Sequence, residues 1–181
     1  MKVLVGCEFS GVVRDAFIAK GHDAWSCDLL PTEKPGPHIQ GDILKHLDEG
    51  WDLAIFHPPC THLASSGARW FMKKVVQQQL ALDFVRALLE APIPKIALEN
   101  PVGIISSNIR KPDQIVQPWM FGHGETKATC LWLKNLPLLV PTKVVRGRAH
   151  RIHEMPESKD RWKLRSVTYK GLATAMADQW S

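Results

Sequence analysis

The stretch FHPPCTHLASSG, residues 56–67, places Cys60 directly after two prolines and follows it with a histidine and several small residues. Pro58 and Pro59 restrict the backbone and remove two N–H donors, so the loop is stiff and holds the Cys60 side chain in a set direction. A thiol in such a loop has three possible uses: packing as a small apolar side chain, binding a metal, or attacking a substrate as a nucleophile.

A zinc site is the weaker alternative. His57 and His62 stand near Cys60, but no CxxC motif and no second His/Cys pair supplies the further ligands that zinc requires. The zinc-dependent nucleobase deaminases carry Pro-Cys-x-x-Cys, and Leu63 stands here at the place of the second cysteine. We therefore expect no metal at this loop.

Nucleophilic attack by a thiol requires a base, or a neighbour that lowers the thiol pKa. His57 and His62 are candidates, although each could equally be a hydrogen-bonding group of the loop. Glu99 is the third candidate because it closes an apolar strand. We expect partial desolvation to raise the pKa of Glu99, so that it carries a proton near neutral pH. The alternative is that Glu99 caps a helix or pairs with a lysine.

The hydrophobic pattern predicts an α/β protein with a mostly parallel sheet, because short apolar runs alternate with helical periodicity. The predicted strands cover residues 3–6, 23–28, 39–43, 51–56 and 94–100, followed by an antiparallel hairpin of 129–133 and 136–140. The predicted helices cover residues 11–21, 70–91 and 170–180. In the second helix, apolar residues recur every four positions at Val76, Leu80, Phe84 and Leu88.

Polar or reactive residues follow the ends of five predicted strands. They are Glu8, Asp28, Asp42, Cys60 and Glu99. In parallel sheets ligands bind beyond the carboxyl ends of the strands, so we expect these five side chains to gather at one edge.

Length and composition predict one soluble domain over residues 1–181, because 181 residues suffice for one good core and not for two. No apolar run is long enough to span a membrane. The four cysteines form no CxxC pair, which favours reduced thiols and a cytoplasmic location. The net charge is +5, and residues 142–170 hold nine Lys or Arg against three acids. This segment favours contact with nucleic-acid or nucleotide phosphates; the alternative is a solvated surface.

Taken together, the motifs resemble those of the cytosine-5 methyltransferases. Pro59-Cys60 after one strand and Glu99-Asn100 after the next resemble their Pro-Cys and Glu-Asn-Val. The run 41–43, Gly-Asp-Ile, resembles their motif of the same residues, and 64–67 resembles their Ser-x-Ala-Gly run. The resemblance covers residues 1–140 and extends to the C-terminal helix, and it is nearest to short, phage-type members, to judge by ATCLWLKNLP and GLATAMADQW. It implies a Rossmann-like class I methyltransferase sheet, in the bacterial host cell if the protein is phage-encoded.

The resemblance also implies an activity: S-adenosylmethionine-dependent methylation of cytosine carbon 5 in DNA. Cys60 would add to ring carbon 6, Glu99 would protonate ring nitrogen 3, and Asn100 would orient the Pro59-Cys60 loop. Asp28 would hold the cofactor ribose and Asp42 the adenine amino group. The cofactor contacts implied in full are Glu8, Phe9, Ser10, Gly11, Asp28, Asp42 and Pro58. The implied contacts to substrate or nucleic acid are Lys127, Thr129, Arg146, Arg148, Arg151 and Arg165.

Two departures from the family pattern leave alternatives open. The loop at 7–12, Cys-Glu-Phe-Ser-Gly-Val, keeps one of the three glycines of Phe-x-Gly-x-Gly-Gly. The basic insert 141–166 stands where the family carries a target-recognition domain and is too short to build a second core. We therefore expect weak sequence selectivity, a very short target, a partner that reads the sequence, or a free cytosine nucleotide as substrate. A further alternative is a catalytically inactive nucleic-acid-binding protein.

Overall fold

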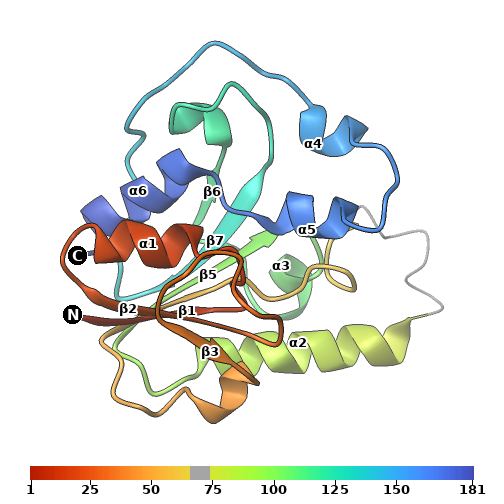
Figure 1. Ribbon diagram of the computed structural model, residues 1–181. Coiled ribbons are helices and arrows are strands. Elements are labelled where there is room, and N and C mark those ends of the chain that lie inside the picture. The colour runs from red at the N-terminus through yellow and green to blue at the C-terminus, as the bar shows by residue number, and fades with distance from the viewer. Residues whose placement is uncertain (66–73) are drawn as a thin grey trace.

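The computed structural model describes residues 1–65 and 74–181, and a seven-stranded sheet runs through its centre (Figure 1). The strand order is β3-β2-β1-β4-β5-β7-β6, with β1 to β5 parallel and β7 antiparallel to both β5 and β6. The strands are β1 (Lys2–Gly6), β2 (Asp23–Asp28), β3 (His38–Gln40), β4 (Leu53–Phe56), β5 (Lys95–Pro101), β6 (Gln114–Val116) and β7 (Thr129–Lys134). The predicted mostly parallel α/β fold is confirmed.

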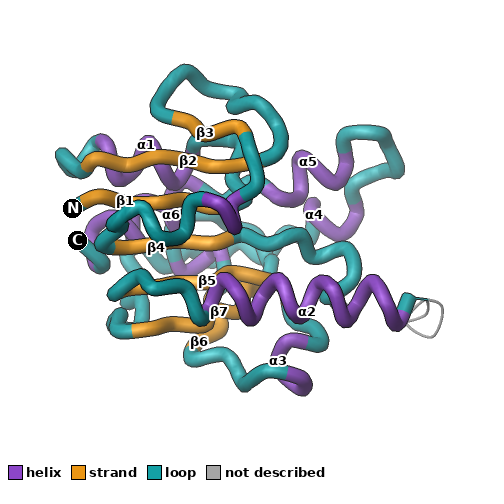
Figure 2. The backbone as a smooth tube through the Cα atoms, turned by 90° about the horizontal axis from the view of Figure 1, so that it is seen from below, coloured by secondary structure: helices purple, strands orange, loops and turns teal. Residues whose placement is uncertain are grey.

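Helices cover both faces of the sheet (Figures 1 and 2). Helices α1 (Val12–Ile18) and α6 (Lys170–Gln179) pack together on one face, and α2 (Val75–Leu89) covers the other. The short helices are α3 (Ile105–Asn108), α4 (Arg151–Glu154) and α5 (Arg161–Ser166), with 3-10 turns η1 (Ile43–Lys45) and η3 (Pro118–Met120). The sheet is therefore the middle of three layers, and its carboxyl edge remains available for ligands.

The core explains why the central strands read as continuous apolar runs. All four residues of β4 are fully buried, since helices cover both faces of the sheet. The apolar stripe expected on the second helix is only partly correct. Leu88 is buried, but Val76 and Leu80 are 70% and 65% exposed. The predicted beginning of this helix, at residue 70, lies outside the described residues.

The second strand predicted for the hairpin, 136–140, is wrong. Asn135 adopts a positive φ of 54° directly after β7 and turns the chain away, and Pro137 lacks an N–H donor. The Gln114 side chain then takes up both the N–H and the C=O of Leu139, each at 2.8 Å. The actual antiparallel neighbours of β7 are β5 and the short β6, which the sequence pattern missed.

The Cys60 loop is tied to the segment that follows β5. Ser65 N donates to Val102 O at 3.0 Å, and Ile104 N donates to Leu63 O at 2.9 Å. Between these two bonds the backbones meet at Gly103, where a Cβ atom would lie 2.0 Å from the carbonyl oxygen of Leu63. Only glycine permits this approach without separating the two segments.

We predict that Gly103→Ala lowers the free energy of unfolding by about 2 kcal/mol, since the added methyl group overpacks a backbone contact. Urea denaturation of both forms measures the difference. Gly41→Ala is the matched control: the atom nearest to its added Cβ lies 3.7 Å away, so its unfolding midpoint should stay close to wild type. Equal midpoints for Gly103→Ala and the wild type would contradict the prediction.

Candidate functional site

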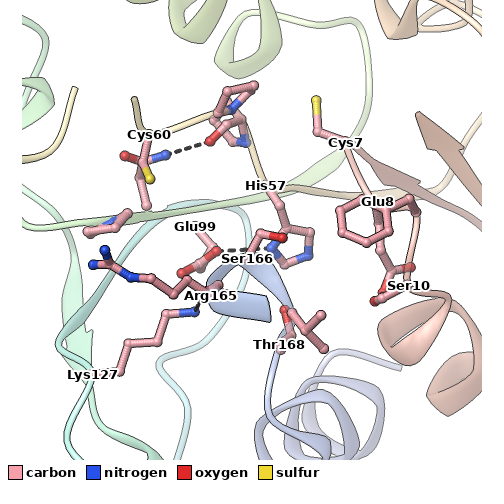
Figure 3. Close-up of a pocket in the computed structure, with 16 residues that line it drawn as sticks. Cys7, Glu8, Ser10, His57, Cys60, Glu99, Lys127, Arg165, Ser166 and Thr168 are labelled. Atoms are coloured by element: carbon pink, nitrogen blue, oxygen red, sulfur yellow. Dashed lines mark hydrogen bonds and ion pairs between the residues drawn. The ribbon is translucent and has the colours of Figure 1, made fainter. Parts of the chain in front are cut away.

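Cys60 and Glu99 line the same cavity, of about 90 Å³, at the carboxyl edge of the sheet (Figure 3). The register explains their meeting, because β4 and β5 are adjacent and Phe56 pairs with Leu98. The chain after β4 therefore starts beside Glu99 and Asn100, which still belong to β5. Of the predicted site residues, those lining this Cys60 cavity are Glu8, Phe9, Ser10, Pro58, Pro59, Cys60, Glu99, Asn100, Lys127 and Arg165.

The loop that carries Cys60 is held from both sides. Asn100, which is buried, donates from Nδ2 to Pro58 O at 2.8 Å. On the other side, Leu63 N and Ala64 N both donate to Cys60 O, at 3.0 and 2.9 Å. With two prolines in the same loop, these bonds leave Cys60 little backbone freedom.

The expectation that Glu99 carries a proton near neutral pH is wrong. Burial by itself would raise the pKa of Glu99, but hydrogen bonds from His57 and Thr129, with the charge of Lys127, lower it below the ordinary value. The His57 contact runs from Nδ1 to Glu99 Oε2 at 3.1 Å. The effect of desolvation on the Glu99 pKa is outweighed because two hydrogen-bond donors and one positive charge favour the carboxylate. Glu99 is therefore ionised in the resting site.

The residue Cys60 is exposed at the protein surface. Desolvation by the surrounding loop and the nearby Glu99 carboxylate raise the pKa of the Cys60 thiol, while Lys127 and Arg165 oppose them. At neutral pH the resting sulfur is thus mainly the protonated thiol. Attack by this residue requires loss of the thiol proton when the substrate binds.

The basic residues predicted for the substrate divide into two groups. Lys127 and Arg165 lie at the cavity, where Lys127 Nζ donates to Arg165 O at 2.9 Å, and Thr129 lies beside Glu99. The others stand away from the cavity lining. Arg148 stacks on Trp119, 3.9 Å from the ring centroid, and Arg151 forms an ion pair with Glu125 at 2.6 Å. Arg146 is exposed on the same segment.

Glu8 performs a local task in the loop between β1 and α1. Its carboxylate accepts from Val13 N at 2.7 Å, Arg14 N at 3.3 Å and Ser10 Oγ at 3.2 Å. It therefore occupies the amides at the beginning of α1, which in many nucleotide-binding folds are left for a ligand anion. Gly11 supplies the left-handed φ of 70° at the helix N-cap.

A second and larger cavity of about 620 Å³ lies beside the first, and Cys7 and Pro59 line both. We call it the Asp28 cavity. Asp28 and Asp42, both predicted for the cofactor, line it, and burial raises the pKa of Asp28. The polar residues are joined by apolar side chains, Leu29, Ile43, Leu44, Leu80, Ala81 and Phe84. This size and lining suit a small-molecule ligand.

Several residues of the two cavities escaped the sequence analysis. Ser166, Val167 and Thr168, at the end of α5, close one side of the Cys60 cavity, because the basic insert folds back onto the sheet edge. Leu80 belongs to the Asp28 cavity. The sequence did contain a signal for Leu80. The apolar residues that recur every four positions form a stripe that continues past the buried part of the helix to Leu80, which is exposed.

Within residues 1–65 and 74–181, no three His, Cys, Asp or Glu side chains gather in a way that could hold a metal ion. The helices of this part of the chain are all too short or too polar to cross a membrane.

The fold resembles that of a solved structure, although comparisons with family models and curated proteins find no match. No protein-family model and no curated protein matches the chain. Among solved structures, it matches the crystal structure of a "putative DNA modification methyltransferase" encoded within a prophage of E. coli, with a TM-score of 0.53 and 17% identity. The match covers 79% of this chain and 51% of that one, so the chain spans about half the length of that neighbour. The fold is thus α/β and methyltransferase-like.

We predict that Glu99→Gln makes the stability of the protein less dependent on pH. The folded-state pKa of Glu99 lies below its ordinary value of 4.5, so its ionisation stabilises the fold above that pH. This contribution is lost as the pH falls through the folded-state pKa. Wild type should exceed Glu99→Gln in stability at pH 7, and the gap should shrink in acid, as measured by urea denaturation at both pH values. Glu90→Gln, an exposed position, is the control. A gap that grows in acid would contradict the prediction.

Proposed function

We propose that the protein transfers a methyl group from S-adenosylmethionine to carbon 5 of cytosine in DNA, through a covalent adduct with Cys60. The observation that carries this proposal is the shared cavity of Cys60 and Glu99, which adjoins the Asp28 cavity across Cys7 and Pro59. Two adjoining cavities, one reactive and one large and mostly apolar, are what a transfer between a cofactor and a base requires. The methyltransferase-like fold agrees with this proposal.

The residues of the Asp28 cavity fit the cofactor. Its apolar walls suit an adenine ring, and its two carboxylates, Asp28 and Asp42, suit ribose hydroxyls and an amino group. His62 Nδ1 is buried here and has no hydrogen-bond partner within residues 1–65 and 74–181, so a polar ligand atom would satisfy it. When bound, S-adenosylmethionine supplies an electrophilic methyl group.

Cys60 acts as the nucleophile in the proposed reaction. Its thiol loses a proton to water and the sulfur adds to carbon 6 of the ring, which makes carbon 5 electron-rich enough to take the methyl group from the sulfonium, with S-adenosylhomocysteine as the leaving group. Carbon 5 then loses its proton to water, and the electrons of that bond restore the ring double bond and expel Cys60 as a thiolate. The Lys127 and Arg165 charges lie near Cys60 and favour the thiolate that this sequence needs.

Glu99 stabilises the adduct by hydrogen bonding to ring nitrogen 3. Because Glu99 is ionised in the resting site, it must take up a proton with the base before it can protonate that nitrogen. The hydrogen bond from Asn100 to Pro58 keeps the sulfur in line with the ring throughout. Asn100 thus acts on the loop and not on the base.

Access of the base requires a wall of the Cys60 cavity to move. The cavity holds about 90 Å³, whereas benzene, which is smaller than cytosine, is bound in an engineered protein cavity of about 150 Å³. The wall at 165–168 is the end of the basic insert, and Lys127 holds it through one hydrogen bond to Arg165 O. A flipped-out base carries its own phosphates, which would meet this basic wall as it opens.

Covalent trapping tests the proposal directly. We predict that DNA containing 5-fluorocytosine forms a stable adduct with the wild-type protein and S-adenosylmethionine, because fluorine cannot leave carbon 5 as a proton does. The adduct would appear as a shifted band on a denaturing gel. Cys60→Ser should give no adduct, whereas Cys130→Ser, at a buried cysteine outside both cavities, should still give one. Failure of the wild type to form an adduct would overturn the proposal.

Salt dependence separates DNA from a free nucleotide as the substrate. We predict that the logarithm of the DNA association constant falls steeply with the logarithm of the salt concentration, and that Arg146→Ala flattens the slope by about 0.9 if one phosphate contact is lost. Fluorescence anisotropy with labelled DNA measures this slope. Lys20 follows the carboxyl end of α1, whereas the Cys60 cavity lies near its amino end. Lys20→Ala should therefore leave the slope unchanged. Binding that does not depend on salt would favour pyrimidine modification on a free nucleotide.

A further inference from the structure

His57 is a buried polar residue to which the proposed reaction assigns no role. It follows β4 directly, and its backbone N–H donates to Gly6 O at 2.9 Å. Its side chain is only 7% exposed and lines the Cys60 cavity. Nδ1 bonds to Glu99 Oε2, but Nε2 is buried and has no hydrogen-bond partner among the described residues. A buried polar atom left in this way points to a missing ligand.

The Glu99 contact determines what kind of ligand atom Nε2 can meet. An ionised carboxylate can only accept, so Nδ1 carries the hydrogen of this bond. In the neutral ring Nε2 then carries a lone pair, and it can bind only an N–H or O–H donor. The same logic orients the histidine of a Ser-His-Asp triad, where a carboxylate fixes the tautomer.

The position of His57 indicates which ligand supplies that donor. In Figure 3 the ring lies between two groups, with Cys60, Glu99 and Lys127 on one side and Glu8 and Ser10 on the other. The second group belongs to the loop between β1 and α1, at the end of the cavity that adjoins Cys7. On this side lies the Glu8 carboxylate. A carboxylate attracts a cationic group of a ligand and repels an anionic one.

We propose that His57 is a positioning residue that joins the cofactor to Glu99: Nε2 accepts a hydrogen bond from the ammonium group of S-adenosylmethionine, and Nδ1 holds the Glu99 carboxylate. This inference rests on the proposed function. In this arrangement the methionine part of the cofactor lies beside Glu8, with its ammonium group toward His57. Cofactor binding then fixes the His57 ring, and the ring in turn fixes the carboxylate that must meet the base.

Two substitutions separate the two ends of the ring. In His57→Asn the side-chain amide can still donate to Glu99 from near the Nδ1 position, but no atom reaches the Nε2 position. In His57→Gln the amide reaches the Nε2 position, and the Nδ1 donor is lost. His46→Asn, which changes a surface histidine paired with Glu49, controls for the substitution itself.

Calorimetric titration of S-adenosylmethionine, without DNA, tests the outer end of the ring. His57→Asn should bind about tenfold more weakly than wild type, as expected for one lost hydrogen bond to a charged group. His57→Gln should remain within about threefold, a difference of less than 1 kcal/mol. Urea denaturation of each variant establishes that the protein remains folded at the titration temperature.

The rate of adduct formation on 5-fluorocytosine DNA, at saturating cofactor, tests the inner end. Here His57→Gln should be slowed at least about tenfold, because Glu99 loses its donor, and His57→Asn should be affected less. A residue that merely supports the fold would weaken both measurements in both variants, in proportion to lost stability. Such parallel losses, or cofactor binding by His57→Asn as tight as wild type, would overturn the inference.

The same measurements keep the inference apart from the proposed function. If wild type binds S-adenosylmethionine and forms the adduct but the two variants do not separate, the role of His57 is wrong and the methyltransferase proposal stands. If wild type binds no S-adenosylmethionine, both proposals fail together.

Discussion

The adjacency of the parallel strands β4 and β5 is the constraint on which the site depends. Their register places Phe56 opposite Leu98, and β4 ends there while β5 continues to Pro101, so the chain after β4 brings His57 and Cys60 beside Glu99 and Asn100 of β5. The proximity of Cys60 and Glu99 requires the pairing of β4 with β5. Backbone contacts at Gly103 and the hydrogen bond from the Asn100 amide then hold the Cys60 loop against β5 and the segment after it. These contacts fix the position of the sulfur relative to the two strands.

The two buried carboxylates of the Cys60 cavity show how internal partners change what a residue can do. Glu8 caps α1 and so takes the amides that a ligand anion would use. Glu99 is buried, yet it is ionised because His57, Thr129 and Lys127 surround it. For Glu99, the hydrogen bonds and the Lys127 charge outweigh desolvation. The Cys60 cavity therefore has the Glu8 carboxylate at the loop between β1 and α1, and the positive charges of Lys127 and Arg165 near Cys60.

The basic insert has two relations to the rest of the chain. Its end, at α5, helps to line the Cys60 cavity, and Trp162 and Lys163 contact the Phe9 ring of the β1–α1 loop. Its earlier part remains on the surface, where Arg146 is exposed and Arg148 covers Trp119. A segment too short for a second core is thus held by packing on the core of the sheet.

The sequence by itself determined the strand and helix alternation, and with it the parallel sheet and the edge where Glu8, Asp28, Cys60 and Glu99 gather. Those features depend on local apolar periodicity and on the rule that parallel strands share a carboxyl edge. Tertiary structure alone decided the partner of β7, the direction of the Glu99 pKa and the place of Arg165 in the cavity wall. Each of these features depends on residues that are distant in the chain, such as His57 and Lys127 around Glu99. The local sequence does not indicate which distant residues will be neighbours.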